Sequence, residues 1–242
     1  MKTVASGEPL SPFEKVYYTR EAENQDFLER KYLILAFVHT ADKNRLEAKR
    51  NALLALDCMS QAATLVNVIT VLQMNGYNEN VLEITKNFVE HARNPKVLAA
   101  LAPSLTALPN ISYICVVYES LSKAGLQAKE MLPMCEQVLS AAKYAKEIFG
   151  IPLDAVGRIS EFAARSADSF NATINNAQYT ISPTGEDMSL VFNVEDGDFD
   201  LVDLDLGLIE FLIDSEMDKL ALVARFEFLP SDCEKVVTQY AN

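Results

Sequence analysis

The sequence predicts an α+β fold, in which an irregular, elongated helical bundle is followed by a four-stranded antiparallel β-meander and a short C-terminal helix. Half of the 242 residues are hydrophobic, which is enough to form a sizeable core. Apolar residues recur with a helical period as far as Ser169 and with a strand period after Phe170. We therefore expect an N-terminal arm over residues 1–10, a helical bundle over 11–169, and an acidic sheet with the C-terminal helix over 170–242.

The first helix is expected to begin after Ser11 and to run to about His39. Ser11 and Glu14 have the spacing of a capping box, and Pro12 suits the first helical position because its missing N–H would have no partner there. No repeated residue signature follows this helix along the chain. The sequence therefore favours an irregular bundle over a solenoid of equal repeats.

A second, long helix is expected from Asn44 to Met74. Asn75 and Gly76 follow it, and Gly commonly ends a helix because it adopts the left-handed conformation easily. Proline and glycine divide the rest of the bundle. Shorter helices are expected over 79–92, from Pro95 to an interruption at Pro103, over 110–123, over 127–149 with a kink or break at Pro133, and over 152–169.

The sheet is predicted from alternating apolar and polar residues over 188–194 and 220–228. Between these stretches, Asp196-Gly197 has the composition of a tight hairpin turn. The segment 199–213 is predicted to be a further strand. Its alternating apolar residues stand at even-numbered positions before Gly207 and at odd-numbered positions after it. A one-residue bulge at Gly207 would let both sets face the same core.

Four antiparallel strands joined by short turns follow from these patterns. After the last strand, Ser231 and Glu234 have the spacing of another capping box, so a short C-terminal helix is expected to begin there. Acidic side chains would then occupy the polar face of the sheet and its loops.

The charge of the chain is concentrated in one segment. The net charge is −13, and the stretch from Ser166 to Asp218 contains thirteen Asp and Glu residues but no Lys or Arg. The remaining chain has 21 acidic and 21 basic residues and is neutral. A concentrated negative field disfavours direct binding of nucleic acid and of an anionic membrane. It suits a basic protein partner, a cation, or simple solubility.

The acidic residues around the predicted hairpin form the candidate site. Asp196, Asp198 and Asp200 have the D-x-D-x-D spacing of half a calcium loop, so Ca²⁺ or Mg²⁺ is the cofactor to consider, and no other is implied. The rest of that loop pattern is missing. A charged hairpin that prevents edge-to-edge aggregation is the structural alternative. As a partner-binding acidic face, the candidate residues are Glu195, Asp196, Asp198, Asp200, Asp203 and Asp205.

Catalytic motifs are missing from the sequence, which favours a protein that is not an enzyme. His39 and His91 belong to no metalloprotease or di-iron motif, and the glycines form no phosphate-binding loop. No Cys-x-x-Cys pair occurs, and Cys58 and Cys115 lie in apolar runs, where we expect buried thiols.

Two uncharged stretches, residues 58–78 and 97–118, are long enough to span a bilayer. Polar residues interrupt the first and two prolines the second, so buried bundle helices are favoured and a membrane location is not expected. The first fifteen residues lack the apolar core of a signal peptide, which predicts a cytoplasmic protein.

Three functions stay open on the sequence. The favoured one is a non-catalytic interaction or assembly subunit, whose acidic meander docks a basic protein partner or a further copy in a homo-oligomer. An inhibitor, an immunity-type protein or a particle-associated protein would be versions of it. The second is a metal-binding protein or metal-dependent enzyme that uses the hairpin from Asp196 to Asp205. The third is a helical protein that inserts into membranes.

Overall fold

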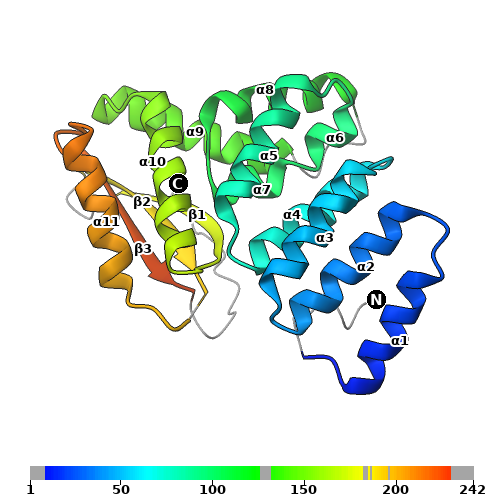
Figure 1. Ribbon diagram of the computed structural model, residues 1–242. Helices are drawn as coiled ribbons and strands as arrows, with labels where there is room; N and C mark the ends of the chain where they lie inside the picture. Colours follow the sequence, from blue (N-terminus) through cyan, green and yellow to red (C-terminus); the bar gives the residue numbers. More distant parts are fainter. Residues whose placement is uncertain (1–8, 126–131, 182–184, 186, 196, 230–242) are drawn as a thin grey trace.

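The predicted α+β class is confirmed by the computed structural model, which describes residues 9–125, 132–181, 185, 187–195 and 197–229 except for the side chain of Met134. Helices make up most of the described chain, and one mixed sheet of three strands lies at one end (Figure 1). The helices are α1 (Pro12–Glu23), α2 (Leu28–Ala41), α3 (Arg45–Asp57), α4 (Ala62–Met74), α5 (Asn78–His91), α6 (Pro95–Ala99), α7 (Ala102–Ala107), α8 (Ile111–Ala124), α9 (Leu132–Phe149), α10 (Leu153–Ser169) and α11 (Leu201–Asp214), and the strands are β1 (Ile174–Ile181), β2 (Met188–Val194) and β3 (Leu222–Phe228).

The N-terminal helices pack against one another in chain order. In Figure 1 the chain runs from α1 on the right, through the central helices, to α11 on the left. The contact between α2 and α3 is lined by small side chains, because Ala36, Ala48, Ala52 and Ala55 are fully buried. Small residues in such positions let two helix axes approach closely, so that the helices pack without large side chains between them.

The two long helices predicted near the N-terminus are each divided in two. The chain leaves the helical conformation between α1 and α2, and again between α3 and α4. At the second break, the Glu29 carboxylate of α2 accepts hydrogen bonds from the backbone N–H of Ser60 (3.0 Å) and from the side chain of Thr64. A tertiary contact therefore replaces the helical hydrogen bonds that the local sequence alone would favour.

The later helices agree with the predicted ranges where the structure describes them. Pro133 is the second described residue of α9, and residues 126–131 lie outside the described residues, so the predicted kink or break at Pro133 stays a prediction. Two cysteines need a correction. Cys58 and Cys115, expected to be buried, are both exposed. Cys58 follows the end of α3 at the surface, and Cys115 lies on the outer side of α8, whereas Ile114 and Val117 face inward.

The predicted four-stranded antiparallel meander is wrong. The strand β2 pairs with β1 in the antiparallel sense and with β3 in the parallel sense, and α11 forms the crossover between β2 and β3. The segment 199–213 was expected to be a strand with a bulge at Gly207, but it is helical from Leu201 onward. The predicted hairpin turn at Asp196-Gly197 is also wrong, because the chain passes from β2 into α11; Asp196 itself and the predicted C-terminal helix lie outside the described residues.

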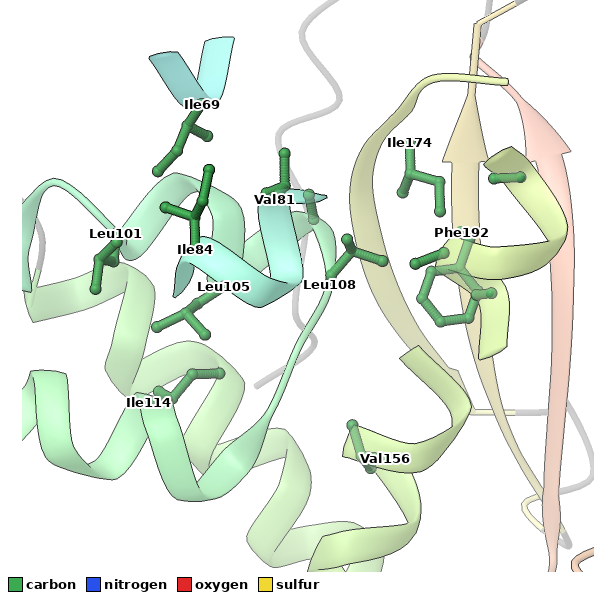
Figure 2. Close-up of a cluster of buried hydrophobic side chains, with 14 of the residues drawn as sticks. Ile69, Val81, Ile84, Leu101, Leu105, Leu108, Ile114, Val156, Ile174 and Phe192 are labelled. Carbon is green, nitrogen blue, oxygen red and sulfur yellow. The ribbon is translucent and has the colours of Figure 1, made fainter. Parts of the chain in front are cut away.

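The sheet and the helices share one core. Every residue of β2 is buried, and Phe192 on this strand is fully inaccessible. Figure 2 shows Phe192 and Ile174 from the sheet beside Leu108 and Val156 from the helical part. The same hydrophobic cluster extends from α2 to β3. The sheet is therefore held against the helices by continuous packing, and α11 is held with it.

Candidate functional site

The helix α11 contains several of the acidic residues that the sequence singles out. Its first turn is stabilised by Asp200, whose side chain accepts a hydrogen bond from the backbone N–H of Val202 at 2.9 Å. Asp203 follows in the same turn. A negative charge at this end of a helix is favourable because the unpaired N–H groups give it a partial positive charge. Asp200 and Asp203 thus help to explain why a helix begins here.

One side of α11 packs into the fold. Leu204, Leu208 and Leu212 are buried, and α11 contacts α10 and β3. On the same side Phe211 stacks on Phe162 of α10, with ring centroids 4.3 Å apart and an angle of 10° between the rings. These contacts account for the attachment of α11 to the rest of the protein.

The opposite side of α11 is also apolar, and it is exposed. Val202, Leu206, Ile209 and Ile213 keep 59%, 52%, 46% and 56% of their surface accessible. Their spacing of four, three and four residues places them on one line along three turns of the helix. We call these four residues the outer stripe. Nothing in the described part of the chain covers it.

An acidic row runs beside the outer stripe. Asp203, Glu210 and Asp214 follow one another at helical spacing, about a quarter of a turn round the helix from the stripe. All three are exposed, and none forms an ion pair with another described residue. We call these three residues the acidic row. The outer face of α11 therefore combines apolar contact area with negative charge that no described basic residue neutralises.

The second half of this row is unfavourable for the helix itself. Glu210 and Asp214 are four residues apart, where two like charges destabilise a helix by about 0.2–0.5 kcal/mol. Both lie near the C-terminal end, whose carbonyl groups already carry partial negative charge, and the last turn contains no basic residue. These two acids therefore do not contribute to the stability of the isolated chain.

The remaining predicted site residues are not brought together. Asp205 accepts a hydrogen bond from the backbone N–H of Phe226 in β3 at 2.7 Å, and burial raises the pKa of this carboxyl group. Glu195 follows β2 and accepts a hydrogen bond from Asn175 at 3.3 Å, while Asp198 is exposed in the next loop. Asp196 lies outside the described residues. Of the six predicted residues, Asp203 alone belongs to the acidic row.

The proposed metal ligands do not share a strand. Asp200 caps α11 with its carboxylate, and Asp198 lies in the loop before it. Within the described residues, no group of three His, Cys, Asp or Glu side chains could hold a metal ion. Asp196, the third predicted ligand, is outside this search. The spacing of ligands along one strand, on which the metal hypothesis rested, is therefore not found.

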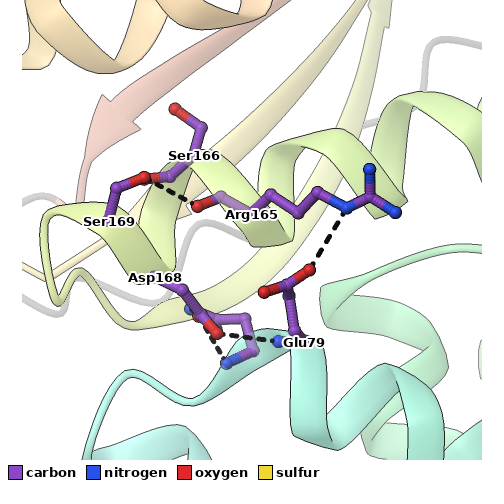
Figure 3. Close-up of polar contacts among 6 residues, drawn as sticks. Glu79, Arg165, Ser166, Asp168 and Ser169 are labelled. Atoms are coloured by element: carbon purple, nitrogen blue, oxygen red, sulfur yellow. Dashed lines mark hydrogen bonds and ion pairs between the residues drawn. The ribbon is translucent and has the colours of Figure 1, made fainter.

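A separate cleft of about 930 Å³ lies where the start of α3, the α4–α5 turn, the start of α5 and the end of α10 meet. One wall carries the carboxylates of Glu79, Glu83 and Asp168, and two of them, Glu79 and Asp168, already bind groups of this protein. Asp168 accepts hydrogen bonds from the backbone N–H groups of Asn78 (2.7 Å) and Glu79 (3.1 Å), and so caps α5 from another helix (Figure 3). Burial raises the pKa of Asp168, and the hydrogen bonds oppose this effect. Arg165 pairs with Glu79 at 3.1 Å.

The other wall of the cleft is basic. Arg45 donates a hydrogen bond to the backbone carbonyl of Asn75 at 2.7 Å, and its guanidinium carbon lies 5.0 Å from the centre of the Tyr77 ring. Lys49 lies over the same ring, with its Nζ 4.6 Å from the centre. Lys43 is exposed beside them. Neither lysine has a carboxylate within ion-pair distance among the residues described here.

Sequence reasoning missed both the outer stripe and the basic wall. The stripe has a signal in the sequence, because its four apolar residues have helical spacing across Gly207. The basic wall has a weaker one in the four cationic residues between Lys43 and Arg50. The cleft has none, because it joins segments separated by more than 100 residues.

A search for membrane spans finds no helix with the length and apolar character needed to cross a bilayer in the described parts of the chain. Comparison with known proteins gives no match to this chain among family models, curated proteins or solved structures.

Proposed function

We propose that this protein is a non-catalytic interaction or assembly subunit, and that α11 docks a basic protein partner. The observation that carries the proposal is the outer stripe, which lies exposed beside an acidic row that forms no ion pair with the residues the structure describes. Monomeric proteins expose single apolar side chains commonly, but a stripe along three turns of one helix is characteristic of an interaction surface. An inhibitor or immunity-type protein that covers the basic surface of its target is one form of this function.

The two parts of this surface have different roles in binding. Burying the exposed half of each stripe residue would supply about 1 kcal/mol per residue and most of the affinity. The acidic row would add less affinity, because exposed ion pairs contribute about 0.2–1 kcal/mol each. The main effects of the acidic row are to speed the association with a basic partner and to disfavour the binding of acidic proteins. Binding through this face should therefore depend on salt.

The partner that fits best is an amphipathic basic helix. A straight, convex stripe packs well against a second helix that has apolar residues at every third or fourth position. Lysine or arginine on one side of that helix would lie opposite Asp203, Glu210 and Asp214. Such a contact would also reduce the repulsion between Glu210 and Asp214, which no described basic residue compensates.

The test uses a synthetic helical peptide of leucine and lysine as the probe, with binding followed by fluorescence anisotropy. Wild-type protein should bind the peptide, more weakly at 0.5 M than at 0.1 M NaCl. The substitutions Leu206→Ser and Ile209→Ser should weaken binding about tenfold or more. The row variant Asp203→Asn, Glu210→Gln, Asp214→Asn should also bind less tightly.

A matched control separates the site from the general acidity of the protein. Glu23, Asp57 and Glu161 are exposed acids of the helical body without an ion pair among the described residues. Their triple Gln/Asn variant removes the same charge as the row variant and should bind the peptide as the wild type does. Equal loss in both triple variants would refute the proposal, because binding would then follow net charge alone.

A further inference from the structure

The same reasoning identifies a partner surface within this protein. We infer that α11 of one copy docks on the basic wall of the cleft in a second copy, so that the chain assembles head to tail. This inference rests on the proposed function, since it assigns an occupant to the α11 surface. It is carried by the complementarity of two surfaces that stay exposed in the described part of the chain.

The two surfaces match in shape and in apolar character. The outer stripe is a convex line of four aliphatic side chains, and the cleft is a concave space of about 930 Å³. At the rim of the cleft Leu46 is 76% exposed, and the Tyr77 ring lies within the lining. Leu46 and Tyr77 can therefore receive aliphatic side chains of the stripe.

The charges also match. Lys43 and Lys49 have no ion pair among the described residues, and Asp203, Glu210 and Asp214 have none either. Arg45 is held in place by the carbonyl of Asn75 and by the Tyr77 ring, so its charge is positioned in advance of binding. Prior positioning reduces the entropy that association would cost.

The acidic wall determines the orientation of the contact. Asp168 and Glu79 are satisfied by hydrogen bonds and by Arg165, whereas Glu83 has no partner among the described residues. The acidic row must therefore lie along α3 and away from α5. Neutralising Glu83 removes a repulsive charge, so the substitution Glu83→Gln should strengthen self-association by about two- to fivefold.

A chain cannot fill its own cleft with its own α11. This helix packs on α10 and β3, and Figure 1 shows it on the left of the molecule, with α10 between it and α3. The contact thus joins two different surfaces of two copies. An interface of this kind closes into a ring or continues as an open chain of subunits, in contrast to a symmetric dimer that closes on itself.

The test is sedimentation velocity of the full chain, with protein concentration raised up to about 200 μM. We expect species larger than a monomer that grow with concentration at 0.15 M NaCl, where screening reduces the repulsion between two copies of net charge −13. At 1 M NaCl the assembly should weaken, because the contacts between the acidic row and the lysines are then screened too. A wild type that stays monomeric throughout would overturn the inference.

Two variants make the test specific. The α11 variant combines Leu206→Ser with Asp203→Asn, Glu210→Gln and Asp214→Asn, and the cleft variant combines Leu46→Ser with Lys43→Gln and Lys49→Gln. Lys49 is half-buried and the other substituted residues are exposed, so circular dichroism should show the wild-type fold, with only small changes in the thermal midpoints. Each variant alone should be monomeric. An equimolar mixture should give a one-to-one dimer that does not grow, because one intact surface of each kind is left.

The outcomes separate this inference from the proposed function. Assembly that persists in either variant, or a mixture that stays monomeric, would overturn the head-to-tail contact. If the wild type stays monomeric and still binds the basic peptide through α11, the inference fails and the proposed function holds. If the peptide does not bind either, both fail.

Discussion

At the scale of single residues, three carboxylates hold separate elements of this protein together by accepting hydrogen bonds from another element. Glu29 of α2 binds Ser60 and Thr64, Asp168 of α10 caps α5, and Asp205 of α11 binds the edge of β3. Each satisfies donors that would otherwise be left at a helix end or a strand edge. None of these contacts can be read from spacing in the sequence, because the partners are distant along the chain.

Replacing Glu29 tests the first of these contacts. Burial raises the pKa of Glu29, but the hydrogen bonds from Ser60 and Thr64 together outweigh it, and the pKa lies below its ordinary value of 4.5. The ionised carboxylate therefore stabilises the fold at neutral pH. The substitution Glu29→Gln should lower the free energy of unfolding by about 1–2 kcal/mol at pH 7.

The pH dependence of this effect has a defined sign. Because the folded pKa is lowered, the stabilisation is present above the unfolded pKa and is lost as the pH falls through the folded value. Urea unfolding at a series of pH values between 7 and 3 should therefore show the wild type and Glu29→Gln converging at acid pH. Equal stabilities at pH 7 would show that the contact is not stabilising.

Tyr179 provides a test of the opposite kind. Its hydroxyl group is buried without a hydrogen-bond partner among the described residues, and burial raises the pKa of this phenol above its ordinary value. Removing a buried polar atom without a partner does not cost stability. The substitution Tyr179→Phe should leave the free energy of unfolding unchanged or raise it by up to about 1 kcal/mol. A clear loss in thermal unfolding would mean that the hydroxyl has a partner.

At the scale of elements, α11 shows why part of the sequence was misread. Val202, Leu204 and Leu206 alternate with polar residues, and this local pattern is typical of a strand. The helix produces the same pattern because it is apolar on two sides, one packed inward and one exposed. The apolar residues move from even-numbered to odd-numbered positions at Gly207, which in a strand would indicate a bulge. In the helix the same shift arises because the apolar positions repeat about every 3.6 residues and not every two.

The other helical predictions succeeded where the signal was local. The capping box at Ser11 predicted the start of α1, and the predicted range 110–123 agrees with α8, which begins after the cap residue Asn110 and ends at Gly125 with a φ of 79°. The breaks before α2 and α4 could not be predicted in the same way. The break before α4 coincides with the contact of Glu29, which depends on how α2 and α4 pack.

The charge of α11 leads to a prediction about this element. The substitution Asp214→Lys removes the repulsion with Glu210 and adds a cation at the C-terminal end of the helix. It should raise the free energy of unfolding by about 0.5–1 kcal/mol and, at the same time, weaken binding of the basic peptide. The matched control is Asp203→Lys in the first turn, which should lower stability because a positive charge is unfavourable there.

Urea unfolding of both variants, together with peptide anisotropy, checks this prediction. If both lysine variants raise the free energy of unfolding, or both lower it, then the partial charges at the two ends of α11 do not determine the change in stability. If Asp214→Lys stabilises the protein and leaves peptide binding intact, the acidic row has no part in docking.

At the scale of the whole molecule, the surplus of negative charge lies near the C-terminal part of the chain, and the helical body is neutral. The sequence was sufficient to predict the α+β class and the segment that carries the charge. It was not sufficient to locate the surface, because this required knowing which side of residues 201–214 is packed. The site therefore depends on tertiary packing, in particular on Leu204, Leu208 and Phe211 facing inward.

Hydrogen–deuterium exchange of the native chain, with and without the basic helical peptide, tests the docking role of α11 most directly. The account predicts slower exchange of the backbone amides of residues 201–214 when the peptide is bound, with little change in α8 and α9. Protection spread evenly over the acidic loops, or confined to the helical body with α11 unchanged, would contradict it.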